Sequence, residues 1–295
     1  MNSSVLVEAK KIFASIQFPS QPQILINIRQ EINKPEPEFK TIAQLVNKDL
    51  ALTAKVIKVV NSSFFGLRSE VKSIGHALAM LGLENFNNLI LASSMRDALG
   101  TKHMSAKEVD IFFEHSLLVA KVTQVISKKN LHDVDRASLS GSGYMAGLFH
   151  DCGIPVLANK FPDYFQKITE GLEANLLVEK IEEEAFGTTH SVVGAMIAKA
   201  WKLPALVGQV IYYHHQEDFS FHEDKQLRIM LANVMLAENI VAEHKYMGFD
   251  DSTGIDLYNS KVSGEESLTN LLNEVDLTIE EFKEIEDFVE DTVLN

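Results

Sequence analysis

The sequence predicts an all-α protein. Leu, Ala, Glu and Lys, which favour helices, are abundant among its 295 residues, and only seven prolines and 15 glycines interrupt it. The strict alternation of apolar and polar residues that is typical of half-buried strands does not run through any long segment. Apolar residues instead recur three or four positions apart, which is the spacing of an amphipathic helix.

Composition limits the classes of function. A hydrophobic content of 46% is enough for one large domain or two modest ones. The net charge of -14 repels phosphate backbones, so we expect no nucleic-acid partner. Cys152 is the single cysteine, which fits a reducing compartment, and no apolar run approaches the about 18 residues of a membrane span. The sequence therefore predicts a cytoplasmic protein without a membrane segment.

Residues 18–100 are predicted to form about five short helices. Asp49 and Ser73 each precede an apolar helix and are expected to cap its N-terminus. Gly82 is expected to end the helix that Ser73 begins. Between these helices, Phe64-Phe65-Gly66-Leu67 is predicted to form a hydrophobic turn, a candidate contact surface.

The helices are predicted to lengthen in the second half of the chain. The polar segment from Lys128 to Gly143 is interpreted as a loop with a flexible Gly141-Ser142-Gly143 end. The run from Tyr144 to Phe149 is apolar on every side, which predicts a central helix, and residues 227–241 predict another apolar helix.

The end of the chain is acidic. Thr278-Ile279-Glu280-Glu281 has the pattern of a capping box and begins a predicted helix with one apolar and one acidic face. We interpret the acidic face as a solvated surface, and an acidic binding tail is the alternative.

A histidine cluster is the candidate site. His150-Asp151 closes the apolar run, and further histidines recur at helical positions. A single such histidine is usually a hydrogen-bonded core residue, but burying five imidazoles and a carboxylate separately requires a partner for each. One shared cation satisfies many of them, and these donors suit Fe, Mn, Zn or Ni. The predicted ligands of one or two ions are His115, His150, Asp151, His190, His214 and His215. A hydrogen-bonded cluster without metal is the alternative.

Other kinds of active site find little support. The sequence contains no glycine-rich phosphate-binding loop, and Gly141-Ser142-Gly143 is not the nucleophile elbow of a serine hydrolase. Cys152 lies at the end of an apolar helix, which favours a small structural residue over a thiol nucleophile.

Several motifs carry a family resemblance. They are Asp49-Leu50-Ala51-Leu52-Thr53-Ala54-Lys55-Val56, Val60-Asn61-Ser62-Ser63-Phe64-Phe65-Gly66, Ala79-Met80-Leu81-Gly82, Glu114-His115-Ser116, Gly147-Leu148-Phe149-His150-Asp151-Cys152-Gly153 and Tyr213-His214-His215. With them the chain resembles the HDOD family, a bacterial output domain related to the HD metal-dependent phosphohydrolases. The resemblance implies an all-helical HDOD domain at residues 18–245, with an N-terminal lobe at 18–102 and an HD-like lobe at 103–245. An N-terminal extension at 1–17 and an acidic helical extension at 246–295 flank it.

The resemblance also implies a function and its limits. HDOD proteins are described as signalling modules, so it implies a protein partner and a nucleotide-type ligand. By motif match, His115, His150 and Asp151 take the first metal positions, and the remaining histidines resemble the extra ligands of enzymes that cleave cyclic dinucleotides. Active HD enzymes have a lysine where this chain has Ile154, and their last ligand is an aspartate where residues 231–234 offer Asn233.

Two hypotheses follow from the motifs. The first is a regulatory protein that acts by binding a protein or a ligand, with a degenerate HD pocket that retains metal. The alternative is a metal-dependent phosphohydrolase or phosphodiesterase acting on a nucleotide or cyclic dinucleotide, with Asp151 as the catalytic residue that bridges two ions.

Overall fold

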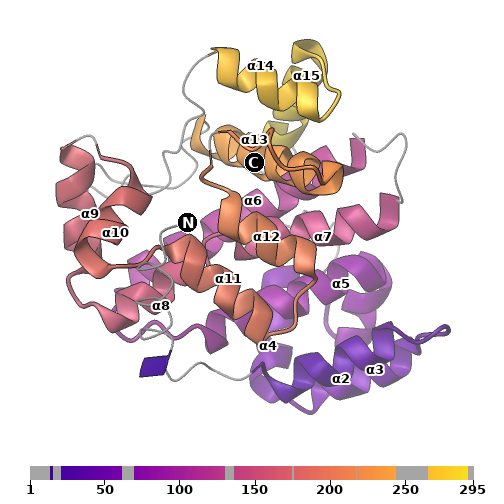
Figure 1. The fold of residues 1–295 in the computed structure, drawn as a ribbon. Helices are drawn as coiled ribbons and strands as arrows, with labels where there is room; N and C mark the ends of the chain where they lie inside the picture. The colour runs from indigo at the N-terminus through magenta and orange to yellow at the C-terminus, as the bar shows by residue number, and fades with distance from the viewer. Residues whose placement is uncertain are drawn as a thin grey trace. The chain divides into compact units, whose positions relative to one another are not determined.

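The protein is described here by a computed structural model of residues 14–15, 21–61, 70–129, 136–174, 176–216, 218–243 and 265–291. These residues form helices and no strands, which confirms the predicted fold class. The chain divides into a smaller unit, Pro19–Leu99, and a larger unit, Gly100–Val289 (Figure 1). The predicted limits of the HDOD domain and its extensions stay predictions. No helix in the described ranges has the length and apolar character needed to cross a membrane.

The smaller unit consists of helices that pack on one long partner. They are α2 (Gln23–Ile32), α3 (Phe39–Asn47), α4 (Leu50–Val60) and α5 (Ile74–Ala98), and α5 packs against each of the other three. Ile28, Val46 and Val56 are fully buried, because each lies on the apolar stripe of its helix.

The predicted caps of this unit are confirmed. The side chain of Asp49 accepts a hydrogen bond from the Leu52 amide at 2.9 Å, and that of Ser73 accepts one from the His76 amide at 3.2 Å. Gly82 has a φ of 73° and interrupts α5, where a left-handed backbone favours glycine. The predicted Phe64-Phe65-Gly66-Leu67 turn lies outside the described residues.

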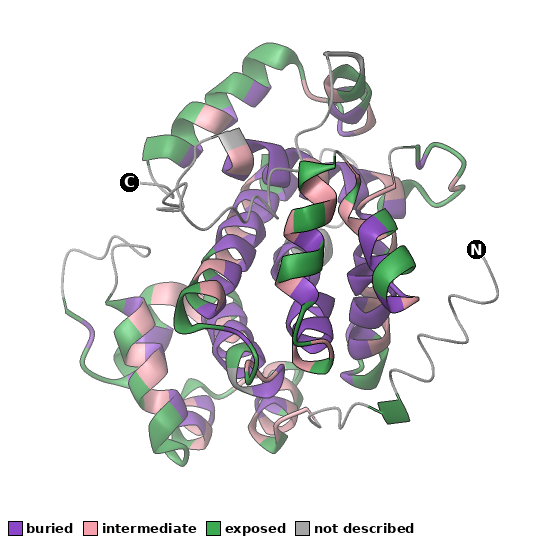
Figure 2. Cartoon of the chain, turned by 90° about the vertical axis from the view of Figure 1, so that its left-hand side faces the viewer, coloured by how far each residue is buried: buried purple, intermediate pink, exposed green. Residues whose placement is uncertain are grey.

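The larger unit is built around two long helices, α6 (Ala106–Lys129) and α7 (Arg136–Phe149), which lie side by side. The other helices of this unit are α8 (Gly153–Lys160), α9 (Tyr164–Glu173), α10 (Val178–Phe186), α11 (His190–Ala200), α12 (Ala205–Tyr213), α13 (Lys225–Glu243), α14 (Glu265–Glu274) and α15 (Ile279–Val289). Helix α13 packs against both α6 and α7, α12 packs against α7, and α11 packs against α8 and α12 (Figure 1). Buried residues cover long stretches of α6, α8, α11 and α13, and Figure 2 shows such stretches on the helices of the interior.

The predicted loop from Lys128 to Gly143 is wrong at both ends. Helix α6 continues through Lys129, and α7 already begins at Arg136, so Gly141-Ser142-Gly143 is helical. The small residues here serve close packing, because a Cβ atom on Gly143 would lie 2.6 Å from Oγ of Ser127 on α6. Local composition suggests a loop, but the contact between the two helices decides the conformation.

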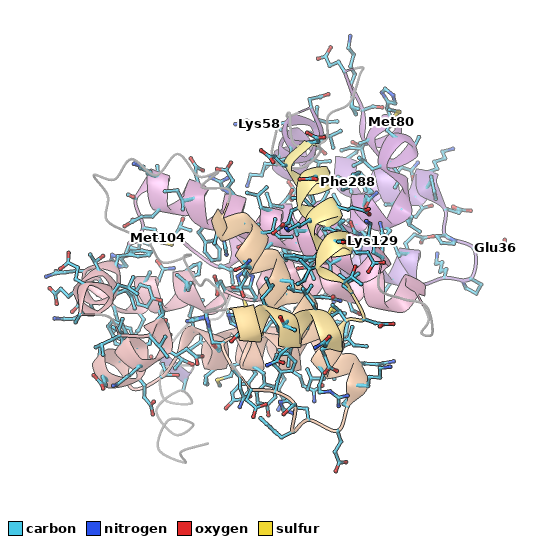
Figure 3. All side chains as sticks on the ribbon, turned by 90° about the horizontal axis from the view of Figure 1, so that it is seen from above. Glu36, Lys58, Met80, Met104, Lys129 and Phe288 are labelled. Carbon is cyan, nitrogen blue, oxygen red and sulfur yellow. The ribbon has the colours of Figure 1, made fainter. Side chains whose placement is uncertain are left out.

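The C-terminal helices α14 and α15 pack on α13 and α6 within the larger unit. The predicted capping box is confirmed, since the Thr278 hydroxyl and amide both donate to Glu281, and the Glu281 amide donates to the Thr278 hydroxyl. Lys129 of α6 lies 3.7 Å from Glu284 of α15 (Figure 3). The acidic face predicted for this helix is therefore in part paired with α6.

Candidate metal centre

The six predicted ligands come together in the larger unit. His115 lies in the middle of α6, and His150 and Asp151 directly follow α7. His190 is the first residue of α11, and His214-His215 follow α12. All six are buried except His215, which is half-buried. Helices that are far apart in the sequence thus bring residues at their ends, and one histidine in the middle of α6, into one cluster.

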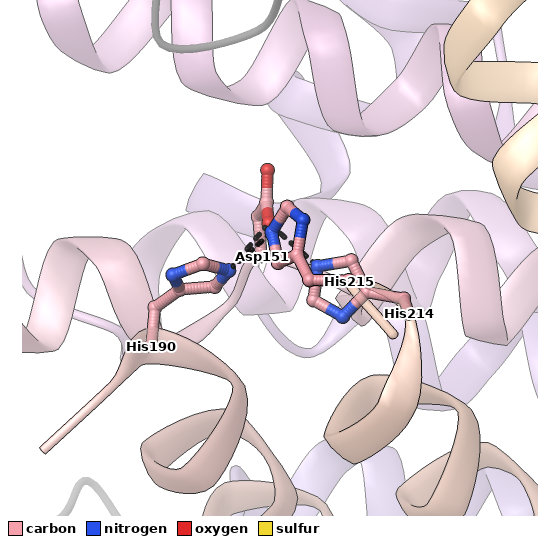
Figure 4. A group of neighbouring side chains, drawn as sticks. All are labelled: Asp151, His190, His214 and His215. Atoms are coloured by element: carbon pink, nitrogen blue, oxygen red, sulfur yellow. Dashed lines mark hydrogen bonds and ion pairs between the residues drawn. The ribbon is translucent and has the colours of Figure 1, made fainter. Parts of the chain in front are cut away.

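Asp151 lies in a group with three histidines, two of which face one of its oxygens. Its Oδ1 atom lies 3.4 Å from Nε2 of His190 and 3.3 Å from Nε2 of His214 (Figure 4). The Nε2 atoms of His190 and His215 are 2.9 Å apart. The ligand atoms of these four residues all lie within 4.8 Å of one another, and we call the set the Asp151 group.

A second set forms on the other oxygen of Asp151. Its Oδ2 atom lies 3.0 Å from Nε2 of His150 and 3.8 Å from Nε2 of His115. These two Nε2 atoms are 3.2 Å apart, and Oε1 of Glu238 lies 3.5 Å from that of His150. The ligand atoms of His115, His150 and Glu238 also lie within 4.8 Å of one another, and we call this set the Glu238 group.

The spacing of these atoms fits transition-metal coordination. Two ligands that each lie about 2.1 Å from one ion are separated by about 3.0 to 3.5 Å, depending on geometry. Most separations within the two groups fall in or near that range. Five imidazoles with two carboxylates form a donor set that suits Fe, Mn, Zn or Ni. The residues present therefore fit one ion in each group, with Asp151 between them.

Backbone contacts orient the imidazoles. Nδ1 of His150 lies 2.7 Å from the Gly147 carbonyl, and Nδ1 of His214 lies 2.8 Å from the Ile211 carbonyl. Because a carbonyl oxygen only accepts, each Nδ1 carries the proton and a neutral ring keeps its Nε2 lone pair free. Both lone pairs then face Asp151, which is the orientation that a metal ligand requires.

The carboxylates favour positive charge in the centre. Burial lowers the pKa of His190, but Glu182 and Asp151 outweigh it and raise that pKa to about 10. At His150 the effect of burial is likewise exceeded, because Asp151 and Glu238 raise the pKa to about 9. Burial raises the pKa of Asp151, yet the histidines, His150 first, hold it well below its usual range. Positive charge is thus strongly favoured beside Asp151.

His115 and His215 are held neutral. Burial and then the neighbouring His150 lower the pKa of His115 to about 3. Desolvation and then His214 lower the pKa of His215 well below its usual value. Neutral imidazole is the form that binds metal, so these two rings need lose no proton when an ion binds.

Two glycines of the His-Asp motif allow the helices to approach. A Cβ atom on Gly147 would lie 2.7 Å from the Cα atom of Ala120 on α6, and one on Gly153 would lie 2.1 Å from the carbonyl oxygen of His190. Real Cβ atoms do not tolerate either contact. Gly147 therefore brings α7 against the helix of His115, and Gly153 brings the start of α8 against His190.

Sequence reasoning missed two buried carboxylates. The final ligand was expected near Asn233, but Nδ2 of Asn233 donates to Oγ of Ser127 at 3.1 Å, and the carboxylate in the centre is Glu238. Five helical positions turn side chains about 140° apart, so the two residues lie on different faces of α13. Glu182 of α10 contacts His190 and was likewise missed. In the sequence, Glu238 is the one acidic residue in the apolar run of residues 229–241, and this pattern could have indicated a buried carboxylate.

The position of the expected lysine is also informative. Ile154 is in the first turn of α8 and only 2% exposed, so its side chain is part of the apolar core. Cys152 is fully buried, and burial raises the pKa of its thiol well above the usual value. The prediction of a structural, non-nucleophilic cysteine agrees with this environment.

Comparison with known proteins assigns the family. The HDOD domain model matches residues 18–217. The chain belongs to the HDOD domain family. An HDOD domain protein with unknown function from Geobacter sulfurreducens has a similar fold, with a TM-score of 0.68 and 24% identity, covering 99% of each chain.

Other relatives share the fold at lower identity. A candidate signal transduction protein from Marinobacter aquaeolei VT8 has a TM-score of 0.72 at 20% identity, covering 94% of this chain and 58% of that one. A candidate phosphohydrolase from Shewanella amazonensis SB2B has a TM-score of 0.69 at 16% identity, covering 99% and 96%. Identities this low show a shared fold.

Curated relatives are longer than this HDOD chain. An uncharacterized protein from Treponema pallidum (strain Nichols) is 27% identical over 238 residues, which are 77% of this chain and 44% of that protein. YuxH of Bacillus subtilis (strain 168) is 28% identical over 99 residues, covering 34% and 24%. The chain thus spans less than half the length of either protein.

Proposed function

We propose that this HDOD protein is a signalling module whose HD-like pocket binds two divalent transition-metal ions, one in the Asp151 group and one in the Glu238 group. The observation that carries the proposal is the position of Asp151, whose two oxygens face two separate sets of ligands. A carboxylate placed in this way would help to hold both ions in a two-metal centre. The ions are drawn from Fe, Mn, Zn and Ni, which these donors suit.

The surroundings of the centre favour regulation over hydrolysis. Bound ions of this class would supply a water molecule of lowered pKa. Phosphoryl transfer also needs positive side chains to hold the phosphate oxygens. The ion pairs of Asp151 and Glu238 are with histidines, and apolar Ile154 stands where active relatives have lysine. The proposed action is therefore recognition of a protein or nucleotide-type ligand, with metal occupancy setting the state of the pocket.

A phosphohydrolase is the second candidate. Glu238 favours it, because this residue supplies a carboxylate that the sequence motif lacks at Asn233. Two candidate phosphohydrolases from Shewanella amazonensis SB2B share the fold, and one of them is described as metal-dependent. In this case the substrate class would be a nucleotide or a cyclic dinucleotide.

One experiment separates the two candidates. Metal content of the purified protein is measured, and hydrolysis of cyclic dinucleotides and of a generic phosphoester is assayed with Mn²⁺ or Fe²⁺. The regulatory proposal expects about two ions per chain without turnover. Metal-dependent turnover that Asp151→Ala abolishes would establish the hydrolase instead. A protein that binds neither ion after metal loading would refute both.

A further inference from the structure

Tyr164, Glu182 and His190 form a hydrogen-bonded chain that ends in the Asp151 group. The Tyr164 hydroxyl donates to Oε1 of Glu182 at 2.6 Å. The other carboxylate oxygen, Oε2, lies 2.7 Å from Nδ1 of His190 and accepts from the His190 amide at 2.9 Å. None of the three residues is more than 1% exposed. Each oxygen of this buried carboxylate thus has a hydrogen-bond partner.

Three successive helices supply the three hydrogen-bonded residues. Tyr164 begins α9, Glu182 lies in α10, and His190 begins α11. Gly187 follows the end of α10, and its left-handed backbone lets the polypeptide turn back, so that Glu182 faces the start of α11. The rings of Tyr164 and Phe186 stack with centroids 5.4 Å apart. The apolar packing of α9 on α10 therefore holds the tyrosine hydroxyl where the carboxylate needs it.

The charge of Glu182 acts on the metal-facing nitrogen of His190. An imidazole that donates its Nδ1 proton to a carboxylate becomes a stronger base at Nε2, and the ring is fixed in one orientation. Nε2 of His190 lies 3.4 Å from Oδ1 of Asp151 and 2.9 Å from Nε2 of His215. An ion in the Asp151 group would bind this nitrogen.

The other oriented histidines lack such a partner. Nδ1 of His150 and Nδ1 of His214 donate to the neutral carbonyls of Gly147 and Ile211. A neutral carbonyl fixes the ring but gives it less electron density than a carboxylate does. Glu182 contacts His190 of the Asp151 group, so its effect is expected on that side of the centre.

We propose that Glu182 is a positioning residue that strengthens metal binding in the Asp151 group and leaves the Glu238 group unchanged, with Tyr164 fixing its carboxylate. This inference rests on the proposed function, since it assumes that both groups hold metal. It also makes the two ions inequivalent, so that the halves of the centre are expected to fill at different metal concentrations.

The first test compares Glu182→Gln with the wild-type chain by titrating Zn²⁺ or Co²⁺ into protein stripped of metal. Glutamine keeps the shape of the side chain and one acceptor oxygen, which can still face His190, but it replaces the other oxygen with a donor and removes the charge. We expect the affinity of one site to fall about 10- to 100-fold while the other is unchanged. Tyr164→Phe keeps the charge and is expected to cause a smaller loss at the same site. Glu184→Gln is the matched control, because Glu184 is exposed on the same helix.

The second test assigns the affected site. His215→Ala removes a ligand of the Asp151 group, and Glu238→Ala removes one of the Glu238 group. In the Glu238→Ala background, Glu182→Gln is expected to lower the affinity for the remaining ion about 10- to 100-fold. In the His215→Ala background it is expected to have no effect on the remaining ion. Circular dichroism and thermal unfolding of each stripped variant check that it folds.

The outcomes separate the inference from the proposed function. If the wild-type chain binds no metal, the proposed function fails. If the wild-type chain binds two ions and folded Glu182→Gln binds both as tightly, only the inference is overturned. Equal weakening in both backgrounds would also overturn it, because the effect would then be general. Should Glu182→Gln not fold, Tyr164→Phe in the same two backgrounds decides the question.

Discussion

At the scale of single residues, the candidate centre includes two carboxylates, Glu238 and Glu182, that the sequence motifs do not predict. The clustering of the five histidines with Asp151 could be predicted from the sequence. Six polar groups in apolar helices each need a partner when they are buried, and a shared site supplies it. Glu238 could not be predicted, because the family pattern points to residue 233. Only the rotation of α13 shows which of its polar side chains faces His150.

Removal of the Glu238 charge tests this assignment. Glu238→Gln is expected to lower the metal content from about two ions to about one per chain, since an amide is a much weaker ligand and brings no charge. The measurement is metal analysis of the purified, metal-loaded protein. Glu223→Gln, at an exposed position before α13, should leave the content unchanged. Two ions retained in Glu238→Gln would show that Glu238 is not a ligand.

At the scale of elements, the capping residues of the helices could be predicted, whereas glycines that allow two helices to pack closely were interpreted as part of a loop. Asp49, Ser73 and Thr278 act as caps as predicted, because a cap is a contact within one turn of the chain. The helical conformation of Gly141-Ser142-Gly143 was not predicted, because the close contact of Gly143 with Ser127 of another helix is not visible in the local sequence. Patterns that are satisfied within a few residues are visible in sequence, and those satisfied across helices are not.

Helix approach at Gly153 is expected to be essential for the centre. In Gly153→Ala the new methyl group would lie 2.1 Å from the His190 carbonyl oxygen, so the backbone of α8 or α11 must shift. We expect a loss of at least about 2 kcal/mol in unfolding free energy, by analogy with overpacked cores, together with loss of metal. Urea unfolding measures the first effect. Gly208→Ala is the control, because its methyl group meets only ordinary contact at 3.7 Å. A Gly153→Ala protein as stable as the Gly208→Ala one would contradict this account.

In the smaller unit, Asn61 joins the end of α4 to the residues before α5. Its side chain accepts a hydrogen bond from the Val71 amide at 2.7 Å and donates to the Val71 carbonyl at 2.8 Å. Asn61→Ala is expected to lower the unfolding free energy by about 1 to 2 kcal/mol, because both bonds are lost. Asn85→Ala removes a single local bond from an exposed side chain and should cost less. Equal unfolding midpoints in the two variants would rule out this role.

At the scale of the whole molecule, the larger unit is held together by the same helices that carry the ligands. Helices α6 and α13 pack on each other and contribute His115 and Glu238, while α14 and α15 cover their outer faces. The all-helical fold was predictable from residue periodicity. The packing of the acidic C-terminal helix was not, because its apolar face gives no indication of its partner.

Metal loading is expected to stabilise the folded chain. Ligands from α6, α11 and α13 meet only in the native state, so binding favours that state, by about 2.7 kcal/mol for an ion present at 100 times its Kd. The thermal unfolding midpoint should rise with Mn²⁺ or Zn²⁺ and fall again after chelation. Asp151→Ala should abolish most of this response. A midpoint that does not depend on metal in the wild-type chain would argue against a centre that links these helices.

The most direct test of the two-ion centre is anomalous X-ray diffraction from crystals of metal-loaded protein, with data collected at the absorption edge of the bound metal. We expect two peaks, one beside each oxygen of Asp151, with Glu238 as a ligand of one ion and His190 as a ligand of the other. A single peak, or none, in fully loaded crystals would contradict this expectation.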